Sequence, residues 1–64
     1  MINFRSYVKD TVKTELYKLK ETLTTNEVDS IVDSVEFEWN EIGDPDANFE
    51  ALVEWNVNQY LTHS

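Results

Sequence analysis

The sequence predicts an all-α protein, a small antiparallel three-helix bundle formed by a single acidic domain over residues 1–64. Apolar residues recur at spacings of three and four along three segments, which is the period of an amphipathic helix. One Gly and one Pro in 64 residues leave little room for turns, so few and long elements are expected. Short connections make neighbouring helices antiparallel.

The first helix is predicted at about residues 3–23. One apolar stripe runs along it, formed by Phe4, Val8, Val12, Leu16, Leu19 and Leu23. The short polar residues Thr24-Thr25-Asn26 then favour a break, because their side chains compete for backbone hydrogen bonds. We expect Thr25 to cap the next helix, since Glu27 and Asp29 would then lie near its positive end.

The second helix is predicted at about residues 26–42. Its apolar stripe consists of Val28, Ile31, Val32, Val35, Trp39 and Ile42. Residues 34–40 taken alone alternate between apolar and polar, which is the period of a strand. We favour a helix there, because the helical pattern continues on both sides and a lone strand would have no partner.

The third helix is predicted at about residues 45–62. Gly43 suits a left-handed residue after a helix, Asp44 suits an N-cap, and Pro45 suits the first helical position. The expected apolar face contains Phe49, Leu52, Val53, Val57 and Tyr60, with Leu61 at its edge.

The composition limits how this chain is stabilised and where it would work. There is no Cys and only one His, so neither disulfides nor a usual structural zinc site is expected. Stability would come from helix packing or from a dimer, because a chain this short buries a limited core. We predict neither a cofactor nor a metal. We also predict a cytoplasmic location, since neither a signal-peptide run nor a membrane-spanning stretch is present.

The charges are distributed very unevenly. Residues 1–23 hold all five basic side chains and three acidic ones, whereas residues 24–64 hold ten acidic and no basic side chains. The net charge of -8 argues against direct binding to nucleic acid or to anionic membranes, which depends on Lys and Arg. We therefore expect a basic protein as the partner, with a DNA- or RNA-binding protein as one candidate.

Some large aromatics fall outside the predicted buried stripes, and among them are Phe37, Trp55 and Tyr17. Either a thin bundle buries more of each helix than an ideal wheel suggests, or these side chains are exposed anchors for a partner. Aromatic residues are favoured in interface hot spots, and we select Phe37 and Trp55 as the first candidates.

The second helix carries Asp29, Asp33 and Glu36 along one flank, with Glu38 and Glu41 elsewhere on its exposed side. Such acids are spaced by roughly 5–6 Å, a spacing of the same order as that of phosphates along DNA. The alternative is an ordinary solvated surface. The predicted partner-binding residues are Asp29, Asp33, Glu36, Phe37, Glu38, Glu41, Glu50, Glu54 and Trp55.

The sequence does not predict an enzyme. The only His lies next to the last residue, and no Gly-rich phosphate loop is present. We also expect too little room for a substrate pocket of roughly 300 Å³ or more.

Two functions from different classes follow from these features. The first is a DNA-mimic inhibitor or adaptor that binds a basic protein, a type that is common among phage and mobile-element products. The alternative is a self-associating structural or regulatory bundle, a homodimer whose acidity only confers solubility. A carrier or metal-binding module is the weakest hypothesis, because no attachment motif and no complete EF-hand loop is present.

Overall fold

The structure is a computed structural model that describes residues 3–43 and 46–63. It contains three helices, α1 (Phe4–Lys18), α2 (Thr25–Ile42) and α3 (Phe49–His63), and no strand among the described residues. All three pairs of helices are in contact. The predicted all-α three-helix bundle is therefore confirmed.

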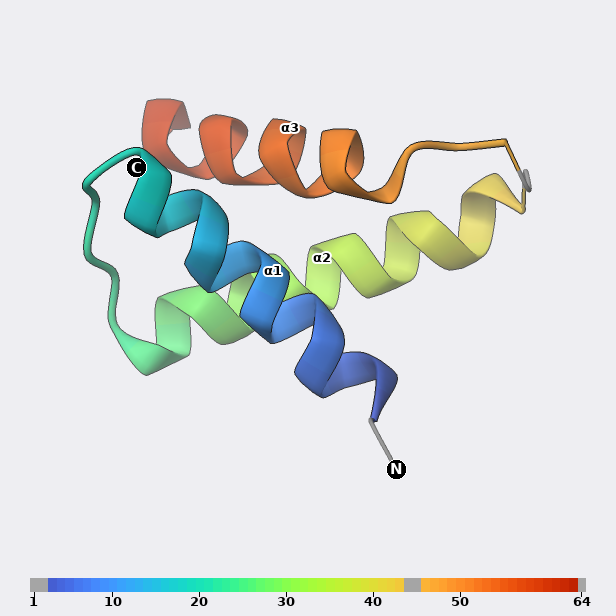
Figure 1. Cartoon of the computed structure of the whole chain (residues 1–64), viewed down its shortest axis with the longest axis horizontal. Helices are drawn as coiled ribbons and strands as arrows, with labels where there is room; N and C mark the ends of the chain where they lie inside the picture. Colours follow the sequence, from blue (N-terminus) through green and yellow to red (C-terminus); the bar gives the residue numbers. More distant parts are fainter. Residues whose placement is uncertain (1–2, 44–45, 64) are drawn as a thin grey trace.

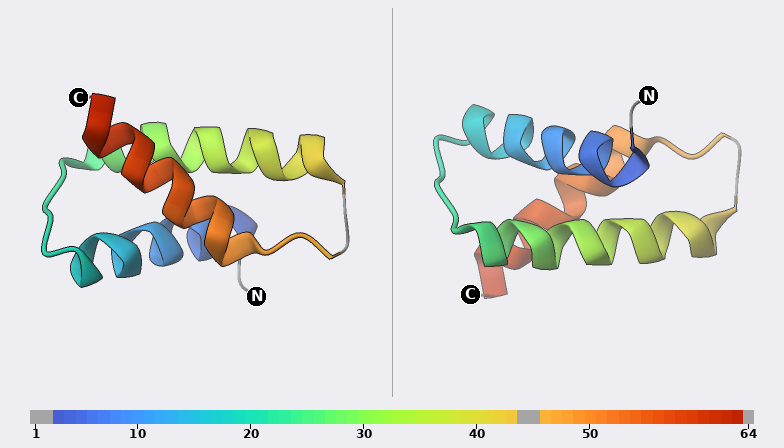
Figure 2. Two further views of the ribbon diagram at one scale, coloured as in Figure 1. Left: turned by 90° about the horizontal axis from the view of Figure 1, so that it is seen from above. Right: turned by 90° about the horizontal axis from the view of Figure 1, so that it is seen from below.

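Consecutive helices run in opposite directions along the long axis of the molecule, but they cross one another obliquely (Figure 1). Seen from above and from below, α3 lies diagonally across the pair formed by α1 and α2 (Figure 2). The start of α3 contacts the start of α1, where the ring centroids of Phe49 and Phe4 lie 6.0 Å apart. Its end contacts the start of α2, where the Tyr60 hydroxyl bonds to Glu27.

Helix α1 ends earlier than the apolar stripe predicts. Its last helical residue is Lys18, and Lys20 adopts the left-handed conformation with φ 58°. The Glu21 N–H donates to the Leu16 carbonyl at 3.0 Å and the Lys20 N–H to the Tyr17 carbonyl at 3.1 Å, which is the Schellman arrangement of a helix end. The predicted end at residue 23 was wrong because this stop lacks the usual Gly.

Helix α2 begins with a capping box, one residue before the predicted cap. Thr24 rather than Thr25 is the N-cap, and its hydroxyl accepts from the Glu27 N–H at 3.2 Å. The Glu27 carboxylate accepts in return from the Thr24 N–H at 2.9 Å. This reciprocal pair satisfies two backbone donors, which a cap at Thr25 would not do. Residues 34–40 are helical, and Gly43 follows with the predicted positive φ.

Helix α3 begins at Phe49, four residues later than predicted. Asn48 is the residue that caps it, because its side-chain oxygen accepts from the Ala51 N–H at 3.1 Å. The proposed cap Asp44 and first-turn Pro45 lie outside the described residues. The later start places the Phe49 ring between α1 and α2, with its centroid 5.3 Å from Tyr7 and 5.1 Å from Trp39.

The core consists almost entirely of valines from all three helices. The buried apolar residues are Val8, Val12, Leu16, Val28, Ile31, Val32, Val35, Val53 and Val57. All nine buried residues belong to the predicted stripes, but three other stripe residues, Phe4, Leu19 and Ile42, are exposed. Small core side chains bury little apolar area each, so the fold depends on close helix packing.

Candidate protein-binding surface

Three of the nine predicted partner-binding residues lie at the contact between α1 and α2, where basic side chains neutralise them. The Arg5 Nη1 atom lies 2.8 Å from Asp33 Oδ1 and 3.1 Å from Glu36 Oε1. The Lys9 Nζ atom lies 3.7 Å from Asp29 Oδ1. The hydrogen bond to Asp33 is the main cause that raises the pKa of Arg5. The predicted row of acids is thus engaged within the molecule.

Phe37 and Trp55 are exposed, with 66% and 55% of their surfaces accessible. They lie on two different helices, and together they border an open groove of about 440 Å³ between α2 and α3. The groove is lined almost entirely by apolar atoms, from Phe37, Ile42, Leu52 and Trp55, with Glu38 and Glu41 beside them. Four predicted residues, Phe37, Glu38, Glu41 and Trp55, therefore meet at one surface.

The groove is open to solvent on the outside of the bundle, where α2 and α3 diverge. It is not an enclosed pocket, so the expectation of too little room for a substrate pocket stays a prediction. We call this surface the α2–α3 groove, defined by Phe37, Glu38, Glu41, Ile42, Leu52 and Trp55.

A buried asparagine fixes one of the two groove carboxylates. Asn56 is only 8% exposed and donates through its side-chain amide to Glu38 Oε2 at 3.0 Å and to the Leu52 carbonyl at 2.9 Å. Both contacts satisfy a polar group that would be costly to bury alone. Asn56 was not among the predicted residues, although its position between Val53 and Val57 places it on the buried side of α3.

The last two predicted acids, Glu54 and Glu50, lie apart from the groove centre. Glu54 lines a shallow hollow next to Trp55, on the outer side of α3. Glu50 lines a different hollow of about 260 Å³ that faces α1. The nine predicted residues therefore do not form one continuous face.

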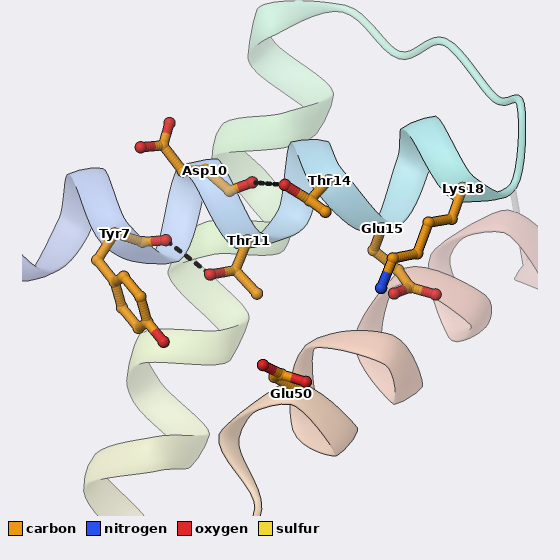
Figure 3. Close-up of a pocket in the computed structure, with 7 residues that line it drawn as sticks. All are labelled: Tyr7, Asp10, Thr11, Thr14, Glu15, Lys18 and Glu50. Atoms are coloured by element: carbon orange, nitrogen blue, oxygen red, sulfur yellow. Dashed lines mark hydrogen bonds between the residues drawn. The ribbon is translucent and has the colours of Figure 1, made fainter.

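The hollow at Glu50 lies between α1 and α3, and its α1 wall includes Tyr7, Thr11 and Lys18 (Figure 3). The Thr11 hydroxyl donates to the Tyr7 carbonyl at 2.9 Å, and Thr14 likewise donates to Asp10 at 2.9 Å. These hydroxyls are hydrogen-bonded to their own helix. The arrangement contains no nucleophile paired with a base among the residues that line it.

Glu27 and Tyr60 join the start of α2 to the end of α3. The Tyr60 hydroxyl donates to Glu27 Oε2 at 3.2 Å. The hydrogen bond from the Thr24 N–H is the main cause that lowers the pKa of Glu27, whereas burial, followed by the Glu27 charge, raises the pKa of Tyr60. This pair holds two helix ends together, away from the α2–α3 groove.

Tyr17, which also falls outside the predicted stripes, is 85% exposed. It lines a separate hollow together with Lys13 and Leu23, formed by α1 and the start of α2. Since it does not line the α2–α3 groove, Tyr17 provides a matched exposed aromatic for comparison with Phe37 and Trp55.

Among the described residues, no three His, Cys, Asp or Glu side chains are grouped so that they would hold a metal ion. Within the same residues, none of the helices has the length and apolar character needed to cross a membrane. Comparison with known proteins finds no match to this chain among family models, curated proteins or solved structures.

Proposed function

We propose that this protein is a non-enzymatic binder of a basic protein surface, and that it docks through the α2–α3 groove. The observation that carries the proposal is the pairing of two exposed aromatics, Phe37 and Trp55, with carboxylates at a single groove. Exposed apolar surface beside polar groups is typical of protein-binding sites, and aromatic residues supply much of the energy of such contacts.

The charge around the groove supports a basic partner. Glu38 and Glu41 line it, Glu54 lies next to Trp55, and no Lys or Arg is among the lining residues. Covering carboxylates with a partner is costly unless the partner supplies cations. The overall charge of -8 would in addition steer a basic partner toward the protein and accelerate association.

The geometry favours this mixed surface over strict mimicry of DNA. A mimic would present its acids as a free row, but Asp29, Asp33 and Glu36 are in ion pairs with Lys9 and Arg5. A DNA- or RNA-binding protein remains one source of the basic surface. In that case, added DNA would compete with the protein for its partner.

The groove is a poor candidate for a homodimer contact. In a twofold dimer the same patch meets itself, so Glu38 and Glu41 of one copy would approach those of the other. The lining residues contain no cation to offset that repulsion. Charge complementarity therefore favours a different, basic protein over a second copy of this chain.

The proposal is tested by affinity capture from a lysate of the source cells, with the protein immobilised and washed at rising salt. We expect recovery of a basic protein that elutes with salt and that the Phe37→Ala/Trp55→Ala double variant fails to retain. The Tyr17→Ala variant, which removes an exposed aromatic elsewhere, should retain it. A salt-resistant dimer that captures no basic protein would contradict the proposal and support the self-associating alternative.

A further inference from the structure

We infer that the occupant of the α2–α3 groove is one basic amphipathic α-helix of the partner, which resembles α1 in its pattern of charges and apolar residues. The inference rests on the proposed function and narrows it from a basic surface to a defined element of secondary structure.

The groove is formed by two helices and is open on the side away from α1. Phe37 and Ile42 from α2 face Leu52 and Trp55 from α3, and no residue of α1 lines it. Helix α1 covers the other side of the same two helices, where it buries Val8 and Val12. A fourth helix in the groove would thus repeat on the outside the packing that α1 makes on the inside.

The groove walls favour a helix over an extended segment. They are side chains of α2 and α3, and the backbone N–H and C=O groups of a helix bond to one another except at its ends. An extended peptide gains affinity by pairing with a sheet edge, and the described residues contain no strand. The occupant therefore cannot bind by adding a strand, and a helix satisfies its own backbone while presenting apolar side chains on one face.

The contact between α1 and α2 shows which charges such a helix needs. Asp33 and Glu36 are three residues apart on α2, and the single guanidinium of Arg5 bridges them. Glu38 and Glu41 repeat that spacing on the same helix at the groove. Neither is in an ion pair with a Lys or Arg of the described residues.

Helix α1 also supplies a template for the sequence of the occupant. Arg5 is followed by Val8 at three residues, by Lys9 at four and by Val12 at seven, so the cations border the buried apolar stripe. We expect the partner helix to carry Arg or Lys with apolar residues three and seven positions later. In the groove, its cation would bridge Glu38 and Glu41 while its apolar residues contact Phe37 and Trp55.

The test is a selection of random 18-residue peptides displayed on phage against the full-length protein, with the Phe37→Ala/Trp55→Ala variant used for counter-selection. We expect enriched peptides to combine Lys or Arg with apolar residues at helical spacing and to become helical on binding, as measured by circular dichroism. Fluorescence anisotropy of the labelled peptides should show affinity falling about tenfold or more in the double variant. It should be unchanged in Tyr17→Ala.

A second pair of variants separates charge from packing. Glu38→Gln/Glu41→Gln keeps the size of both side chains and an oxygen for Asn56, but removes the two charges. We expect weaker peptide binding at low salt and a shallower dependence on salt than in the wild type. The variant Asp33→Asn, on the α1 side, should leave peptide binding unchanged.

Several outcomes would overturn the inference. They are the absence of any enriched peptide, enrichment of acidic or non-periodic peptides, and equal binding to the double variant. The proposed function would survive these results if the lysate experiment still recovers a basic protein. Conversely, peptides of the expected pattern without a basic protein in the lysate would support the groove chemistry and contradict the proposed function.

Discussion

Two regions of α2 carry acids at the same spacing and differ in what lies against them. Beside α1, the pair Asp33 and Glu36 is bridged by Arg5, and the adjoining Val32 and Val35 are fully buried. At the α2–α3 groove, Glu38 and Glu41 lie beside the exposed Phe37, and no cation is among the lining residues. The acids of the first region are paired with a cation of the same molecule, whereas those of the second region are not.

The difference follows from where the sequence places its positive charge. All five basic residues lie within the first twenty positions, so only α1 and its immediate continuation carry them. Helix α1 covers one side of the α2–α3 pair, and none of the described residues covers the other side with a further helix. The side of α2 that α1 covers is therefore paired within the molecule, and the side at the α2–α3 groove is the one that we propose as the partner-binding surface.

The largest contrast between the two regions should be in stability. Leu16→Ala removes a buried α1 side chain and should lower the free energy of unfolding by about 2–5 kcal/mol. Trp55→Ala at the groove should change it by only about 0.5 kcal/mol in either direction, because the ring is exposed. Urea denaturation followed by circular dichroism measures both. A large loss in Trp55→Ala would mean that the groove is part of the core.

A smaller effect is expected at the start of α2, which positions both regions. Thr24→Ala removes the cap hydroxyl that accepts from the Glu27 N–H, and it should cost about 1 kcal/mol. Thr25→Ala should cost less, since the Thr25 side chain is exposed and is not the cap. Thermal denaturation of the two variants gives the comparison, and a larger loss in Thr25→Ala would contradict the capping box.

The ion pairs between α1 and α2 should contribute less to the stability of the fold than the Thr24 cap does, and their contribution should depend on salt. Arg5→Ala should lower the unfolding temperature at low ionic strength, because Asp33 and Glu36 would then repel each other without a shared cation. The deficit should shrink in high salt. Lys13→Ala is the matched control, since Lys13 makes no ion pair among the described residues. Equal effects of the two variants would show that only overall charge matters.

The smallest expected effect is the pH dependence contributed by Glu27. Its pKa in the folded protein lies below the ordinary value of 4.5, chiefly because the Thr24 N–H donates to its carboxylate. Ionised Glu27 therefore contributes stability above pH 4.5, and that contribution is lost as pH falls through the folded pKa. The stability difference between wild type and Glu27→Gln should shrink over that window. A difference that grows on acidification would contradict the assigned hydrogen bonds.

Most of the fold could be predicted from helical periodicity. The valines of the three stripes repeat at three and four residues, and they form the core. The helix ends were harder, because they depend on individual hydrogen bonds. Lys20 adopts a left-handed conformation, which is usually found at Gly, and Asn48 caps α3, which begins four residues later than predicted.

The candidate site could be predicted only in part. The position of Phe37 and Trp55 outside the stripes left two interpretations open, and the structure shows that both side chains are exposed. Periodicity within one helix cannot show which faces of two helices meet, so the pairing of Asp33 with Arg5 was not specified. For the same reason the prediction did not include Ile42 and Leu52 in the groove. Both depend on how the helices cross.

The most direct test of the central claim is site-specific photo-crosslinking in the source cells, with p-benzoylphenylalanine in place of Phe37 and, as the control, in place of Tyr17. We expect the probe at position 37 to link to a basic amphipathic helix of another protein, identified by mass spectrometry of the linked peptide. The probe at position 17 should not link to it. Links from position 37 to a second copy of this chain, or identical partners at both positions, would show that the groove does not bind a basic helix.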